Sequence, residues 1–227
     1  MTPKHKKNLA YLFIIFVLMI NILTPLSAKG TELPFDYKEP TIHMTSVASE
    51  QTTSDSAGIE VEQPYIVLED FETNSDWKAT GAKYNAIDAT ISNDEVRFGE
   101  NALRLDYDFL NQLGTSGIYA SMDERIQIAG NPKKIGMWVY GDGKKHWLRQ
   151  QLIDGNGQSF NIDFTGDYPN GVTWEGWQYV EADIPDNWQA PFEMDLAVRY
   201  MATKDEGKSA GTLYVDNIIA VYGELDT

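Results

Sequence analysis

Residues 102–109, ALRLDYDF, decide the fold class. The large apolar residues stand at every second position: Leu103, Leu105, Tyr107 and Phe109. Arginine and aspartate fill the positions between them. Because successive side chains of a strand point to opposite faces, this alternation predicts a β-strand with one buried face and one solvated face.

Further short β-rich segments follow along the chain. They read SGIYASM (116–122), KKIGMWVYG (133–141), WLRQQLI (147–153), SFNIDF (159–164), WQYVEADI (177–184), MDLAVRYMA (194–202) and GTLYVDNIIAVYG (211–223). Turn-forming sequences such as GDGKK and DGNG separate them, and no convincing amphipathic helix lies between them. This arrangement predicts an all-β protein, an antiparallel β-sandwich or barrel.

The N-terminal region has a different character. Three lysines precede an unbroken apolar run from Leu9 to Ile20, and Leu26-Ser27-Ala28 is typical of a cleavage site. Residues 1–28 are therefore predicted to be a secretory signal peptide, which places the protein outside the cell or in the cell envelope. The alternative is an uncleaved membrane anchor, although the run is shorter than the roughly 20 residues of a membrane span.

Three more regions follow the predicted signal peptide. Residues 29–63 are rich in Ser, Thr, Glu and Gln and are predicted to be a flexible spacer. Residues 64–223 contain the strand pattern and form the predicted domain, and residues 224–227 are a tail. The chain has no cysteine, which excludes disulfides and thiol chemistry.

The chain is strongly acidic. Its formal net charge is −16, and removal of residues 1–28, which hold three lysines and no acids, takes it to −19. Such a surface repels phosphate backbones, so nucleic acid is not an expected partner. Acidity of this kind serves solubility, and one specific cation site is compatible with it.

Two consecutive strand segments carry planar groups opposite their apolar face, and we expect them to be neighbours in one sheet that presents these groups together. In WLRQQLI, Leu148 and Leu152 share one face, and Trp147, Arg149 and Gln151 share the other. In the preceding segment the residues opposite the apolar face are Trp138 and Tyr140, and in MDLAVRYMA the corresponding residue is Arg199.

These residue types together match the surface of a sugar. A sugar ring has an apolar C–H face that an aromatic ring can cover, and its hydroxyl rim needs donors and acceptors such as Arg and Gln. The candidate ligand-binding residues are Trp138, Tyr140, Trp147, Arg149, Gln151 and Arg199. The alternative is that the aromatic residues pack beneath a loop and that Arg149 pairs with an acid, because aromatic residues also dominate ordinary cores.

Residues 65–223 resemble a known family. The segments EDFE, RFGENALRLDYDF, KKIGMWVYGDGKKHWLRQQLIDGNG, WEGWQYVEADIP and LYVDNIIAVYG are similar to jelly-roll, galactose-binding-domain-like carbohydrate-binding modules of bacterial extracellular proteins. The resemblance is to the accessory domain of secreted phosphodiester glycosidases related to N-acetylglucosamine-1-phosphodiester α-N-acetylglucosaminidase. It implies a β-sandwich that binds a polysaccharide or cell-wall glycan.

The same resemblance implies a structural Ca²⁺ ion between the first and last strands. The side chains of Glu72 and Asp216 would bind it, and main-chain carbonyls near Asp70 and Glu100 would complete the site. Calcium is a hard cation that takes about 6–8 oxygen ligands, so carboxylates and carbonyls suit it.

Catalysis is the weaker interpretation of this sequence. Carboxylate pairs such as Asp106 with Asp108, or Glu181 with Asp183, have the residue types of a glycosidase. Among the histidines, His146 alone lies in the predicted domain, beside a turn, so a multi-histidine metal site lacks parts. The sequence therefore predicts a secreted, non-catalytic carbohydrate-binding module. The alternatives are a small glycoside hydrolase or phosphodiester glycosidase, and a cell-envelope protein-interaction module.

Overall fold

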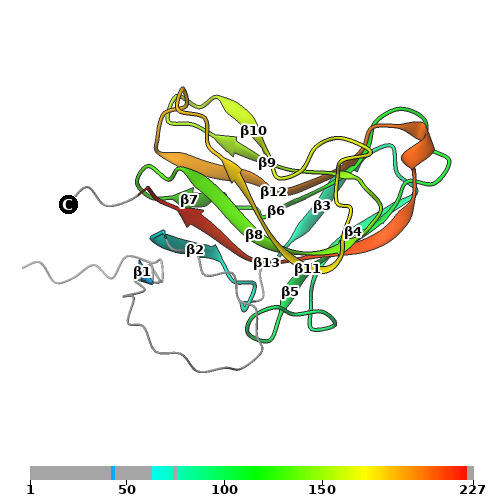
Figure 1. Ribbon diagram of the computed structural model, residues 1–227, viewed down its shortest axis with the longest axis horizontal. Helices are drawn as coiled ribbons and strands as arrows, with labels where there is room; N and C mark the ends of the chain where they lie inside the picture. Colours follow the sequence, from blue (N-terminus) through cyan, green and yellow to red (C-terminus); the bar gives the residue numbers. More distant parts are fainter. Residues whose placement is uncertain (1–41, 44–62, 74–75, 224–227) are drawn as a thin grey trace, which may run out of the picture. The chain divides into compact units, whose positions relative to one another are not determined.

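Two antiparallel β-sheets pack face to face around one apolar core (Figure 1). The computed structural model describes residues 42–43, 63–73 and 76–223. The predicted signal peptide, most of the predicted spacer and the tail lie outside the described residues. Within the predicted spacer, Ile42–His43 form a short strand that pairs with Tyr65 and Ile66.

The first sheet has seven strands. They are β1 (Ile42–His43), β2 (Tyr65–Glu69), β4 (Ala86–Ser92), β5 (Ala102–Asp108), β8 (Lys134–Asp142), β11 (Glu175–Asp183) and β13 (Ala210–Val221). The long strand β13 lies at its centre, with β8 along one side and β5 followed by β2 along the other. β11 lies outside β8, β4 outside β5, and β1 outside β2.

The second sheet has six strands. They are β3 (Lys78–Ala82), β6 (Ser116–Ser121), β7 (Ile126–Ile128), β9 (Trp147–Ile153), β10 (Ser159–Asp163) and β12 (Phe192–Ala202). Here β12 is central, with β9 on one side and β6 and β7 on the other. β10 and β3 are the outer strands, and a 3₁₀ turn, η1 (Asp205–Gly207), precedes β13.

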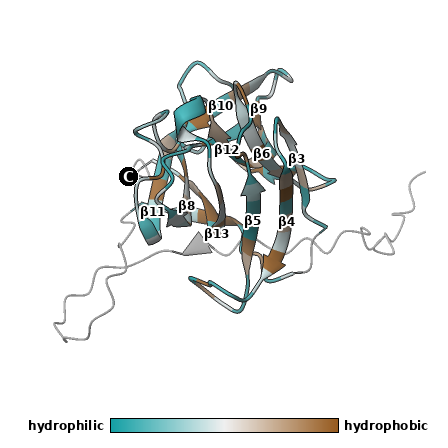
Figure 2. Ribbon diagram, turned by 90° about the vertical axis from the view of Figure 1, so that its right-hand side faces the viewer, coloured by the Kyte–Doolittle hydropathy of each residue, from teal (hydrophilic) through white to brown (hydrophobic). Residues whose placement is uncertain are grey.

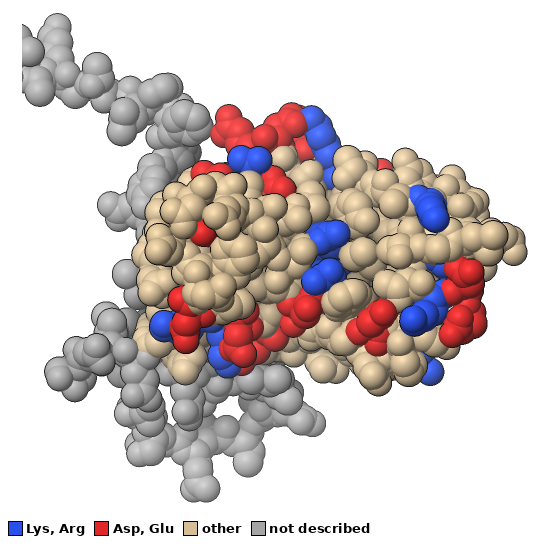
Figure 3. All heavy atoms as spheres, turned by 90° about the horizontal axis from the view of Figure 1, so that it is seen from above, with Lys and Arg blue, Asp and Glu red and all other residues tan. Residues whose placement is uncertain are grey.

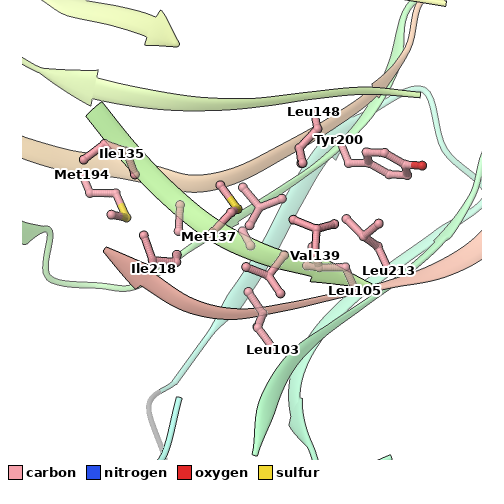
Figure 4. Packing of buried hydrophobic residues seen from close by; sticks show 14 of the residues in the cluster. Leu103, Leu105, Ile135, Met137, Val139, Leu148, Met194, Tyr200, Leu213 and Ile218 are labelled. Carbon is pink, nitrogen blue, oxygen red and sulfur yellow. The ribbon is translucent and has the colours of Figure 1, made fainter. Parts of the chain in front are cut away.

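The core forms from the alternating apolar positions of both sheets. Leu103 and Leu105 of β5 are fully buried. In Figure 4, Leu148 and Tyr200 of the six-stranded sheet face Val139 and Leu105 of the seven-stranded sheet. Side chains of two inner faces that interdigitate in this way form the core of a sandwich. The predicted antiparallel β-sandwich of jelly-roll type is therefore confirmed.

The outer surface is polar and carries mixed charge. Figure 2 shows hydrophilic residues along the loops, while the strands carry both hydrophilic and hydrophobic residues. On the face drawn in Figure 3, Lys and Arg occur as isolated groups among Asp, Glu and uncharged residues. Within residues 63–73 and 76–223, no helix is long and apolar enough to cross a membrane.

Candidate functional site

The six candidate ligand-binding residues lie on two different sheets. Trp138 and Tyr140 belong to β8 of the seven-stranded sheet, and the other four belong to β9 and β12 of the six-stranded sheet. In each strand these side chains alternate with buried core residues, so they point to the outside of their own sheet. The expectation that β8 and β9 are neighbours with one common ligand face is therefore wrong.

The connection between β8 and β9 explains this arrangement. Its backbone bonds to residues 172–174 rather than closing a hairpin: the N–H of Gly143 donates to the carbonyl of Trp174 at 2.9 Å, and that of Lys145 to the carbonyl of Val172 at 2.8 Å. The chain thus crosses from one sheet to the other. Alternation shows which side chains share a face of one strand, but it does not show which sheet receives the next strand.

The outer face of the six-stranded sheet brings four of the candidates together. We call it the six-stranded face, and define it by Tyr119, Trp147, Arg149, Gln151, Asn161, Asp163 and Arg199. Strand register places Arg199 of β12 directly between Tyr119 of β6 and Arg149 of β9, and Arg149 beside Asp163 of β10. The row therefore crosses four strands.

The two arginines of this row are held in the same manner. Arg149 bonds through Nε to Asp163, and its Cζ lies 3.9 Å from the ring centroid of Trp147. Arg199 bonds through Nη1 to Asn161, and its Cζ lies 5.0 Å from the ring centroid of Tyr119. Each guanidinium is therefore held by one polar partner and lies over one aromatic ring. A guanidinium has five N–H donors and no acceptor.

Two buried donors on this face have no hydrogen-bond acceptor among the described residues. They are Nε1 of Trp147 and Nε of Arg199. Gln151 lies in register between Asn161 and Leu196 on the neighbouring strands. The face therefore combines aromatic rings with fixed donors and with amide and carboxylate acceptors.

Sequence reasoning missed three residues of this face. Tyr119 alternates with buried Ile118 and Ala120, and Asn161 and Asp163 alternate with Phe160 and Ile162. The alternation signal was present in both segments. The missing information was the strand order, which sets β6 and β10 beside β12 and β9.

The outer face of the seven-stranded sheet has a different construction. Trp138 lies under the loop between β4 and β5, with Cζ of Arg97 4.2 Å from its ring centroid and the ring of Phe98 5.9 Å away. Tyr140 lies between Trp177 and Tyr214, with centroid distances of 5.5 and 5.8 Å. Trp138 therefore packs beneath a loop, which is the alternative considered for these aromatic residues.

The same loop joins the two carboxylates expected to bind calcium. Oδ2 of Asp216, in β13, accepts hydrogen bonds from the backbone N–H groups of Arg97 and Phe98, both at 2.9 Å. The carboxylate of Glu72, just after β2, accepts from the N–H groups of Glu100 at 3.0 Å and Asn101 at 3.2 Å. Both acids therefore hold one short segment, residues 97–101, against the sheet.

Asp216 has the character of a cation ligand. It is fully buried, and its Oδ1 has no hydrogen-bond partner among the described residues. Burial raises the pKa of Asp216, and the negative charge of Glu72 adds to that effect. A cation would relieve both costs, because buried carboxylates need a compensating charge. This donor set fits a hard oxygen-seeking ion.

The other two expected ligands lie close by in the chain. Asp70 accepts a hydrogen bond from the N–H of Glu72 at 3.2 Å, and Glu100 contributes its own N–H to Glu72. The described segments bring together no group of three or more His, Cys, Asp or Glu side chains that could hold a metal. A bound ion would therefore depend on two carboxylates and main-chain carbonyls.

His146 lies in a buried polar cluster at one end of the core. Its Nε2 is 2.8 Å from Oγ of Ser209, and its Nδ1 is buried without a partner among the described residues. Asp142 accepts hydrogen bonds from the hydroxyls of Tyr107 at 2.5 Å and Tyr200 at 2.7 Å. A serine–histidine nucleophile needs a third group that orients the histidine, and here Asp142 is engaged by the two tyrosines.

The carboxylate pairs considered for catalysis have structural partners. Asp106 accepts from Nε of Arg104 at 2.8 Å and from the hydroxyl of Thr212 at 2.6 Å. Asp108 accepts from the backbone N–H of Leu110, and Glu181 from Lys134. Three of the four acids considered therefore have a structural partner.

The comparisons with known proteins bear on the fold. No protein-family model and no curated protein sequence matches the chain. A solved structure of carbohydrate-binding modules from the β-sandwich superfamily is 12% identical, with a TM-score of 0.50, over 67% of this chain and 60% of that one. The family 11 carbohydrate-binding module of cellulosomal cellulase Lic26A-Cel5E of Clostridium thermocellum is 14% identical, with a TM-score of 0.43, over 71% of this chain and 96% of that one.

Proposed function

We propose that this domain binds a carbohydrate, a polysaccharide or cell-envelope glycan, on the six-stranded face and does not cleave it. The observation that carries the proposal is the cross-strand row in which Arg149 and Arg199 stand side by side, each fixed by a stacked ring and a polar partner. The β-sandwich that this chain shares with carbohydrate-binding modules supports the proposal only as architecture, because a fold alone does not define a function.

The chemistry of the row suits a sugar chain. Each guanidinium offers N–H donors to hydroxyls, while Gln151 and Asp163 provide acceptors. The indole of Trp147 and the phenol of Tyr119 offer apolar surface to C–H groups of the sugar ring.

Two further parts of the proposal rest on the sequence and on the carboxylate site. In this proposal the predicted signal peptide makes the domain a secreted or envelope-associated protein, and the resemblance makes it an accessory part of a phosphodiester glycosidase system. Glu72 and Asp216 hold a structural Ca²⁺ that ties residues 97–101 to the seven-stranded sheet. When bound, the ion neutralises two neighbouring carboxylates.

The test is a glycan array in buffer that contains Ca²⁺, followed by titration calorimetry with the ligands retained. Arg149→Met removes the donors and keeps an apolar side chain of similar length. We expect it to weaken binding by about 10- to 100-fold, the range for losing a charged hydrogen bond. Arg104→Met is the matched control, because Arg104 pairs with Asp94 and Asp106 on the other sheet.

The outcomes separate the alternatives. Loss of binding in the Arg104→Met variant but not in Arg149→Met would place the ligand on the seven-stranded sheet. An array that retains no glycan would favour the protein-interaction module. Release of sugar from a phosphodiester or aryl-glycoside substrate would favour an enzyme.

A further inference from the structure

Two arginines of the six-stranded face stand directly opposite each other. Strand register pairs Arg199 of β12 with Arg149 of β9. Directly opposed side chains of an antiparallel pair have Cβ atoms about 4.5–5.5 Å apart, and two like charges in that position destabilise a sheet. The pair therefore raises the free energy of the folded domain unless nearby negative charge compensates both guanidinium groups.

Among the described residues, one member of the pair has a negative partner and the other has a neutral one. Arg149 forms an ion pair with Asp163 of β10. Arg199 bonds through Nη1 to the side-chain oxygen of Asn161, which carries no charge. Two arginines and one aspartate therefore leave one positive charge of this row without compensation.

Two other arginines of the domain are paired more completely. Arg104 and Arg125 each form ion pairs with two carboxylates. Acidic residues outnumber lysine and arginine by 34 to 18 in the sequence, so a carboxylate partner is easily provided. The asparagine that holds Arg199 therefore keeps available a charge that an aspartate in its place would cancel.

Both guanidinium groups keep N–H donors for a ligand. Within the described chain, Arg149 bonds to the protein through Nε and Arg199 through Nη1. The two Nη atoms of Arg149 and Nη2 of Arg199 are not among the buried unpaired atoms, so these three nitrogens face solvent. The rings of Trp147 and Tyr119 lie against the guanidinium groups and restrict their motion. The pair therefore offers several oriented donors at one place on the face.

A negatively charged group fits both features of this pair. A carboxylate or phosphate accepts several N–H bonds in the forked geometry that a guanidinium provides, and it supplies the missing negative charge. A sugar hydroxyl accepts a hydrogen bond but leaves the charge uncompensated. The surplus of acidic residues elsewhere has little influence here, because exposed charges more than about 8 Å apart are largely screened at physiological ionic strength.

We infer that the six-stranded face selects acidic glycans, and that the anionic group of one sugar unit binds at Arg149 and Arg199. This inference rests on the proposed function and specifies its ligand class. The sugar ring itself lies against Trp147 or Tyr119, next to the two arginines. A uronic acid carries an anionic group on its ring, and a phosphodiester-linked glycan carries one between its units.

The first test is an array that holds polygalacturonate, alginate and a glycerol-phosphate polymer beside neutral galactan, mannan and cellulose oligomers. We expect the domain to retain acidic members. Methyl esterification of a retained uronate then removes the charge and keeps the sugar and its linkage. The acid should bind about tenfold more tightly than its ester, because a hydrogen bond to a charged group is stronger than one to a neutral group. This preference should shrink as the salt concentration is raised.

Two substitutions should move the preference in opposite directions. Arg199→Gln removes the uncompensated charge and keeps a hydrogen-bonding amide, so the preference for the acid over its ester should fall below about threefold. Asp163→Asn removes the carboxylate that competes for Arg149, so the acid should bind several-fold more tightly. Asp94→Asn is the matched control, because Asp94 pairs with Arg104 on the other sheet and its loss should change neither affinity. Melting curves check that each variant is folded.

The outcomes separate this inference from the proposed function. Retention of neutral glycans alone, or equal binding of a uronate and its ester, overturns the inference, while loss of that binding in Arg149→Met still upholds the proposed function. A preference for the acid that neither Arg199→Gln nor Asp163→Asn changes also overturns it. Binding of the glycerol-phosphate polymer alone, with the expected response to both variants, supports the inference and identifies the anionic group as a phosphate. If no glycan of either class is retained, both proposals fail.

Discussion

The buried histidine gives the fold a calculable dependence on pH. The ring of His146 contacts the rings of Tyr107, Phe109 and Tyr200 at centroid distances of 5.4, 5.8 and 5.2 Å. Burial lowers the pKa of His146 from 6.5 to about 4; the charge of Asp142 opposes this shift, and the charges of Lys208 and Lys144 add to it. The folded protein therefore keeps this ring neutral in mildly acidic solution, whereas the unfolded chain protonates it.

The sign and size of the effect follow from this difference. Between pH 6.5 and about 4 the unfolded state binds more protons, so the free energy of unfolding falls as the pH falls through this window. The pKa difference corresponds to about 3 kcal/mol over the whole window. Below pH 4 both states are protonated and His146 makes no further contribution to the pH dependence.

Urea denaturation followed by tryptophan fluorescence measures this contribution at pH 4.5, 5.5, 6.5 and 7.5. His146→Phe keeps the aromatic packing and removes the titrating group. The difference in unfolding free energy between the two proteins should shift in favour of the variant by about 2–3 kcal/mol from pH 7.5 to 4.5. His146→Gln, which keeps a hydrogen-bonding group near Ser209, should show the same trend. Parallel stability curves for all three proteins would refute the reasoning.

Two further predictions concern the metal site and the ligand face. Asp216→Asn removes the buried charge beside Glu72, so the variant should melt higher than the unmodified protein in EDTA but gain nothing from Ca²⁺. The unmodified protein should gain about 2.7 kcal/mol at 100 times the dissociation constant, and a melting temperature that Ca²⁺ does not change would contradict the site. A Cβ on Gly117 would lie 2.8 Å from Cε1 of Tyr119. Gly117→Ala should therefore displace that ring and weaken glycan binding several-fold, and a melting curve checks that the variant is folded. Unchanged affinity would exclude Tyr119 from the ligand face.

The sequence predicted the strands and their buried faces because both depend on local alternation. Leu103 and Leu105 are buried as ALRLDYDF requires, and Arg104 between them lies on the outside. The same rule oriented Trp147 and Trp138 away from the core. Each of these predictions needs only the two-residue period of one strand.

The arrangement of the strands depends on long-range pairing, and local alternation does not contain it. Trp138 and Trp147 are nine positions apart in the sequence, yet they lie on the outer faces of opposite sheets because the connection after Gly143 crosses the sandwich. Tyr119 lies directly beside Arg199 although 80 residues separate them in the sequence. The register shifts between β12 and β9 likewise depend on pairing with a distant strand, and the pattern of MDLAVRYMA does not reveal them.

The two tryptophans also show why an aromatic ring with an arginine over it does not by itself identify a ligand face. Both rings carry a guanidinium, Arg97 at 4.2 Å from Trp138 and Arg149 at 3.9 Å from Trp147. Arg97 comes from a loop whose backbone is bonded to Asp216, so the proposed ion stabilises the cover over Trp138. Arg149 comes from the sheet itself and is fixed by Asp163 on the next strand. The six-stranded face is therefore organised by the strands alone, whereas a Ca²⁺ ion at the proposed site would support the opposite sheet and would not reach a sugar on the six-stranded face.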